Sequence, residues 1–118
     1  MVRFLILTDF EIREIYALKA IVSMTTQQID TYVLDSLMTE LVGEDRRPGA
    51  YILYLALWRL CAAPGEARIS LQDLATATGL SKTAVQRSVA HLARRGLIAV
   101  RSTRRTQPPH YMVLKPWR

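Results

Sequence analysis

The stretch Leu71–Leu92, LQDLATATGLSKTAVQRSVAHL, decides how this chain folds. Ser70 and Ser81 stand where a hydroxyl can cap the first turn of a helix. We therefore expect one helix that ends at Gly79 and a second that runs from Ser81 to Arg95. Because glycine adopts a positive φ without steric cost, Gly79 permits a sharp turn between the two helices.

The side chains of this stretch separate into an apolar face and a polar face. Ala75 lies four residues before Gly79, where the helices cross and only a small side chain fits. An apolar stripe points into the space between the helices: Leu80, Val85, Val89 and Leu92. By helical periodicity, the opposite face of the second helix carries Lys82, Thr83, Gln86, Arg87, Ala90 and Arg94.

After the second helix the apolar pattern changes from a helical period to that of strands. The helix ends at Gly96, and residues 97–101 and 111–114 are predicted strands. Residues 102–110 between them are polar, basic and proline-containing, which predicts a hairpin loop. Gln107 and His110 are expected to be solvated. Ala67-Arg68-Ile69 predicts one more short strand.

These elements resemble the winged helix-turn-helix of DNA-binding proteins, including regulators of the MarR and GntR type and winged replication-initiator domains. The resemblance covers residues 50–115 and rests on the Ala75–Gly79 spacing and on Arg95-Gly96-Leu97-Ile98. It implies that the second helix enters the major groove and that the hairpin is a wing on the backbone or minor groove. The DNA-binding residues it implies are Ser81, Lys82, Thr83, Gln86, Arg87, Arg94, Arg101, Arg104 and Arg105.

The chemistry of these side chains suits DNA. Gln86 can hydrogen-bond adenine through two atoms, and Arg87 or Lys82 can bond guanine or a phosphate. Thr83 can touch a thymine methyl group or a phosphate. The helix N-terminus at Ser81 favours a phosphate, and the wing arginines should reach the backbone or the minor groove.

The charge is distributed unevenly. The net charge is +6, but residues 67–118 contain ten basic residues and one acidic residue, Asp73, whereas residues 1–66 contain six basic and nine acidic residues. No acidic residue lies near the nine basic residues between Lys82 and Arg118 in the sequence. Such a surface favours a polyanionic partner, with nucleic acid ahead of an anionic membrane.

The part of the chain before the winged region is predicted to be helical. We expect one helix at residues 9–23 and another from about Thr25 to Val42, ended by Gly43. The polar loop at residues 44–49 divides an N-terminal helical segment, residues 1–48, from a DNA-binding domain, residues 49–118. The apolar run at residues 50–62 predicts a central core helix, in which Cys61 packs as a small hydrophobe.

The helices before residue 48 offer more apolar surface than a winged domain needs. One interpretation is that they pack on the core helix of the same chain. The other is that they pair with a second copy, because the sequence ends just after the wing and offers no later helix for pairing. The predicted dimer interface is Ile12, Ile15, Tyr16, Ile29, Val33 and Leu37.

Composition and motifs exclude several classes of protein. The 118 residues, half of them hydrophobic, suit one small domain with an appended segment. One cysteine and two distant histidines argue against a disulfide framework and a metal site. No phosphate loop, nucleophile elbow or acid pair beside a histidine is present, so we expect no catalytic residue and no cofactor. No apolar run spans a bilayer, and no cleavage site follows the apolar start, so we expect a cytoplasmic protein without membrane contact.

The sequence thus predicts a mostly α protein with a small β wing, an α+β winged helix-turn-helix preceded by an N-terminal helical segment. The predicted function is a sequence-specific regulator of transcription that binds double-stranded DNA as a homodimer. No residue pattern identifies an effector. Two alternatives stay open: a replication-initiator or partition-type DNA-binding protein, and a winged-helix adaptor that binds proteins.

Overall fold

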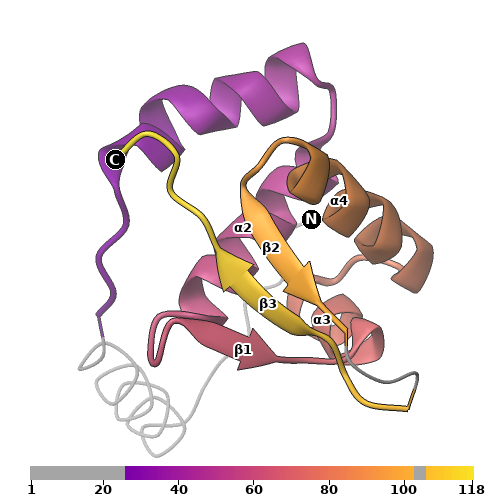
Figure 1. The fold of residues 1–118 in the computed structure, drawn as a ribbon. Helices are drawn as coiled ribbons and strands as arrows, with labels where there is room; N and C mark the ends of the chain where they lie inside the picture. Colours follow the sequence, from indigo (N-terminus) through magenta and orange to yellow (C-terminus); the bar gives the residue numbers. More distant parts are fainter. Residues whose placement is uncertain (1–25, 103–105) are drawn as a thin grey trace, which may run out of the picture.

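A computed structural model describes residues 26–102 and 106–118. Helices and a small three-stranded sheet make up this part of the chain, and α2 passes behind the sheet with α3 and α4 at its right (Figure 1). The elements are η1 (Val33–Leu37), η2 (Thr39–Glu44), α2 (Pro48–Leu60), β1 (Glu66–Arg68), α3 (Leu71–Thr78), α4 (Lys82–Arg94), β2 (Ile98–Arg101) and β3 (His110–Val113). The predicted α+β class is confirmed.

The sheet is antiparallel, with the strand order β1-β3-β2. Since side chains alternate across a strand, each strand has one face toward the helices and one toward solvent. Ile98 and Tyr111 are buried against the helices, whereas Arg101 and His110 lie on the outer face. The three strands begin and end within one residue of the predicted ones. In β2 and β3, short local patterns of β-branched and aromatic residues specify them.

The central helix α2 contributes more buried side chains to the core than any other element. Pro48 is the first residue of the helix. The first amide groups of a helix have no acceptor within the helix, so a proline there costs no hydrogen bond. The Tyr54 hydroxyl donates to the Leu114 carbonyl at 2.9 Å, which fastens α2 to the end of the sheet. Cys61 is buried as predicted, and burial raises the pKa of its thiol. The buried residues of α2 are Ala50, Tyr51, Leu53, Tyr54, Leu57 and Trp58.

The predicted helix from Thr25 to Val42 is wrong at both ends. Residues 26–30 are not helical, because Trp58 of α2 holds them: its indole N–H donates to the Gln28 carbonyl at 2.9 Å, and its own carbonyl accepts from the Gln27 amide at 3.0 Å. Residues 31–44 are helical, mostly with the wider π-helical turn of η1 and η2. Gly43 lies inside η2, because the Asp45 amide still donates to the Glu40 carbonyl, at 2.8 Å.

The inner face of η1 and η2 belongs to the core of this chain. Val33, Leu37 and Leu41 have exposed fractions of 0%, 1% and 0%, and the Tyr51 hydroxyl of α2 donates to the Val33 carbonyl at 2.9 Å. The assignment of Val33 and Leu37 to a dimer interface is therefore corrected, because four-residue spacing identified a buried face without showing what buries it. Ile29 is partly buried and packs against the same core. The predicted helix at 9–23 and its interface residues Ile12, Ile15 and Tyr16 lie outside the described residues.

The last residues of the chain pack on the segment before η1. The Trp117 ring stacks on Tyr32 with centroids 4.7 Å apart, and its N–H donates to Asp30 at 2.9 Å. Arg118 donates to both carboxylate oxygens of Asp30, at 2.8 and 2.7 Å. The hydrogen bonds from Arg118 and Trp117 lower the pKa of Asp30 to about 2, and the bond from Arg118 has the larger effect. Residues 30–32 and 117–118 therefore form a terminal clamp across the two ends of the described chain.

Candidate nucleic-acid interface

The turn between α3 and α4 is built as the sequence predicts. The Ser70 hydroxyl accepts the Asp73 amide at 3.0 Å, and the Ser81 hydroxyl accepts the Ala84 amide at 3.1 Å, so each helix has a capped start. Gly79 ends α3 in the left-handed conformation with φ of 77°. The two helices therefore begin and end within one residue of their predicted bounds.

Packing fixes which face of α4 meets solvent. Ala75 of α3 and Val85 and Leu92 of α4 are buried, and Leu80 and Val89 are partly buried against the same core. The opposite face is exposed, as helical periodicity predicts. Its exposed residues are Lys82, Thr83, Gln86, Arg87, Ala90 and Arg94, with Ser81 at the head of the helix.

The exposed basic residues of α4 are available to a polyanion. Within residues 26–102 and 106–118, no carboxylate oxygen lies within 4.0 Å of the side-chain nitrogens of Lys82, Arg87 or Arg94. Arg95 differs, because its guanidinium lies 2.9 Å from Asp45 and 3.5 Å from Glu40. The outer face of α4 thus carries three cations without a carboxylate partner, whereas Arg95 forms ion pairs within the protein.

Asp45, which sequence reasoning missed, anchors the last turn of α4. The His91 Nε2 lies 2.7 Å from the Asp45 carboxylate, and this hydrogen bond is the main cause that lowers the pKa of Asp45. Asp45 follows η2, 46 positions before His91 in the sequence. No local pattern could therefore have identified the pair, although it fixes how the candidate recognition helix sits against η2.

The hairpin continues the basic surface. Arg101 is exposed at the end of β2, while Arg104 and Arg105 lie in the part of the hairpin that is not described. A groove of about 290 Å³ separates the returning arm of the hairpin from the starts of the two helices. It is lined by Ser70, Leu71, Gln72, Lys82, Thr106, Gln107, Pro108 and Pro109.

The prediction that His110 is solvated is wrong, whereas Gln107 is exposed as expected. His110 is the first residue of β3 and is only partly exposed, with its Nδ1 atom fully buried. Its Nε2 accepts a hydrogen bond from Arg68 Nε of β1 at 3.0 Å. Sequence reasoning missed Arg68 as well, because only the strand register brings the two side chains together.

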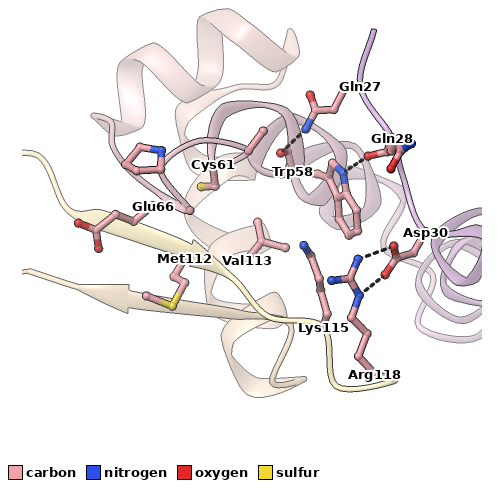
Figure 2. Close-up of a pocket in the computed structure, with 13 residues that line it drawn as sticks. Gln27, Gln28, Asp30, Trp58, Cys61, Glu66, Met112, Val113, Lys115 and Arg118 are labelled. Carbon is pink, nitrogen blue, oxygen red and sulfur yellow. Dashed lines mark hydrogen bonds and ion pairs between the residues drawn. The ribbon is translucent and has the colours of Figure 1, made fainter.

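A larger hollow lies elsewhere in the described part of the molecule. It has a volume of about 700 Å³ and lies between residues 27–30, the end of α2 and the C-terminal segment (Figure 2). The Lys115 ammonium sits 4.6 Å from the centroid of the Trp58 ring, and Asp30 and Arg118 bind each other at its edge. None of the predicted DNA-binding residues lines this hollow, so it is separate from the α4 face.

No helix within the described residues is long and apolar enough to cross a bilayer.

Residues 54–107, just under half of the chain, match the model of the MarR family. Among solved structures, a MarR family transcriptional regulator from Silicibacter pomeroyi is similar with a TM-score of 0.44 and 19% identity, over 92% of this chain and 65% of that one. The chain thus spans less than two thirds of that regulator. The AntR antimony-specific transcriptional repressor is similar with a TM-score of 0.40 and 20% identity, over 99% of this chain and 78% of that one.

No curated protein sequence matches the chain. The residues that match the family span the second half of α2, the helix-turn-helix and most of the hairpin. The resemblance to winged helix-turn-helix regulators of the MarR type is therefore confirmed.

Proposed function

We propose that this chain, whose residues 54–107 match the MarR family, is a sequence-specific regulator of transcription that binds double-stranded DNA. The observation that carries the proposal is the exposed face of α4, on which Lys82, Arg87 and Arg94 have no carboxylate partner among the described residues. Cations ordered on a helix but left unpaired suit a phosphate-rich partner.

In this proposal the exposed face of α4 enters the major groove. Gln86 and Arg87 lie one turn into the helix and contact base edges, with adenine and guanine as their respective partners. Ser81, Lys82 and Thr83 lie at the head of the helix, where phosphate is favoured. Arg94, the last residue of α4, contacts the backbone. Three residues of the wing reach the backbone or the minor groove: Arg101, Arg104 and Arg105.

The family match favours this function over the alternatives. MarR-family domains belong to transcriptional regulators, which supports regulation over replication initiation and over protein recruitment. It also supports a protein that acts by binding rather than as an enzyme. A regulator of this kind works where the chromosome is, so we place the chain in the cytoplasm.

We further propose that residues 49–118 bind DNA and that residues 1–48 join two copies of the chain. Because Val33 and Leu37 are used by the core, the proposed contact rests on Ile12, Ile15 and Tyr16, with Ile29 at its margin. Sedimentation equilibrium of the full chain tests this proposal. We expect a dimer, and a monomer for the Ile12→Glu/Ile15→Glu variant; a monomeric wild type would contradict it.

Fluorescence anisotropy of a labelled generic duplex, titrated at several salt concentrations, tests the main proposal. We expect affinity to fall linearly with salt on logarithmic axes, with a slope of about −0.9 for each phosphate neutralised. Arg87→Ala should weaken binding, whereas Arg59→Ala removes the same charge from the exposed end of α2 and should not. No binding at low salt would reject DNA as the partner and favour the adaptor.

A reporter assay separates the two DNA-binding alternatives. A regulator should change expression from a promoter that carries the duplex the protein prefers. A replication initiator should instead bind an origin and leave that promoter unaffected.

A further inference from the structure

Three side chains cross the wing sheet in one row at the end nearest the hairpin loop. His110 of β3 pairs with Arg68 of β1 on one side and with Arg101 of β2 on the other. Cross-strand partners share a face of the sheet, so the three side chains lie together on its outer face. The next row, which contains the buried Tyr111, faces the helices instead.

Both arginines of this row have uncompensated charge. Arg68 and Arg101 are exposed, and neither guanidinium has a carboxylate oxygen within 4.0 Å among the described residues. Glu66 lies on the same face, two residues before Arg68, and forms no ion pair with it. The row therefore presents two unpaired guanidinium groups on one face of the sheet.

The side chain of His110 holds that of Arg68. Its Nε2 accepts a hydrogen bond from Arg68 Nε at 3.0 Å. Nδ1 is buried, and no described atom accepts from it. His110 therefore makes its hydrogen bond through Nε2 and none through Nδ1. This bond holds the Arg68 side chain through Nε, so that the two terminal nitrogens of the guanidinium can bind a ligand.

The row lies beside the candidate DNA interface. The Ile69 amide, next to Arg68, donates to the Pro109 carbonyl at 3.2 Å, which joins β1 to the returning arm of the hairpin. Ser70 then begins the groove that ends at Lys82, the first residue of α4. In Figure 1 the end of β1, the hairpin and α3 gather at one end of the molecule.

We propose that Arg68 and Arg101 contact the phosphate backbone of duplex DNA at the hairpin end of the sheet, and that His110 is a positioning residue that orients Arg68. This inference rests on the proposed function, and it adds a strand residue outside the helix and the wing to the interface. A guanidinium held through Nε presents two terminal nitrogens in one plane, which suits two oxygens of a phosphate.

The test measures affinity of the full chain for a labelled generic duplex between 50 and 200 mM salt. Arg68→Ala should reduce the logarithmic salt slope by about 0.9, so that the advantage of the wild type shrinks roughly three- to fourfold across this range. Arg101→Ala should do the same. Arg59→Ala is the charge-matched control: Arg59 lines a different groove with Thr26 and Gln27, and its loss should leave the slope unchanged.

A double-mutant cycle tests the positioning role of His110. His110→Ala should weaken binding in the wild type but cause no further loss in Arg68→Ala, and His110→Gln should restore binding because its amide oxygen can accept from Arg68. Equal losses with and without Arg68 would show that His110 acts only on the fold and would overturn its role. Equal slopes for Arg68→Ala and Arg59→Ala would overturn the phosphate contact while leaving the proposed function intact. A wild type that does not bind would overturn both.

Discussion

The helix-turn-helix and the segment before α2 obtain their structure from different sources. In α3 and α4, each cap and the turn are made by residues within three or four positions of one another, such as Ser81 with Ala84. Residues 26–47 depend on partners far away in the sequence: Trp58 holds Gln28, and Asp45 binds His91. A local pattern can therefore predict the first region and must fail at the details of the second.

The largest expected effect tests whether the inner face of η1 is core. Leu37→Ala should lower the free energy of unfolding by about 2–5 kcal/mol, because it leaves a cavity in the core. Leu34, exposed to 47%, is the matched control, and Leu34→Ala should cost less than about 1 kcal/mol. Urea unfolding followed by circular dichroism measures both. Equal losses of stability in the two variants would contradict the assignment of Leu37 to the buried face of η1 and of Leu34 to its exposed face.

The second prediction compares α4 with the wing. On a preferred duplex, Gln86→Ala and Arg87→Ala should each weaken binding by roughly 1–3 kcal/mol and relax the preference at one base pair. Arg104→Ala and Arg105→Ala should weaken binding to all sequences and flatten the salt slope. Competition binding with single-base variants of the duplex measures the difference. Identical behaviour of the two pairs would reject the division into base contacts and phosphate contacts.

A third prediction compares two glycines, one from each region. Gly79→Ala should lower the free energy of unfolding by roughly 1–2 kcal/mol, because alanine resists a φ of 77° even where space is open. Gly43 lies inside η2, where Ala is a better helix former, so Gly43→Ala should be neutral or stabilising by up to about 1 kcal/mol. Thermal and urea unfolding of both variants measure these changes. A stabilising Gly79→Ala would exclude the left-handed turn.

The smallest expected effect concerns the terminal clamp and is a pH dependence. The pKa of Asp30 is lowered from 3.8 to about 2, so its bonds to Arg118 and Trp117 stabilise the fold fully above pH 3.8 and are lost as pH falls through about 2. Asp30→Asn should therefore have a lower free energy of unfolding than the wild type near neutral pH. The difference in stability should vanish once the pH falls below about 2. Asp35→Asn, on the exposed side of η1, is the control and should show no such convergence.

These comparisons also explain which features of the fold and of the candidate site could be predicted from the sequence. It predicted the helix-turn-helix, the strands and the exposed face of α4, since serine caps, Gly79 and helical periodicity are local signals. It placed Val33 and Leu37 on an interface because periodicity shows that a face is apolar and not what covers it. It missed Asp45, Arg68 and the terminal clamp because their partners lie 42 to 88 positions away.

The most direct test of the account is to map the DNA-binding surface on the full chain by ¹H–¹⁵N correlation spectra during titration with its preferred duplex. The account predicts that the largest shifts fall on residues 81–94, on the hairpin and at Arg68, with little change in η1 and α2. Shifts concentrated on residues 26–60, with the amides of α4 unmoved, would contradict the claim that α4 reads DNA.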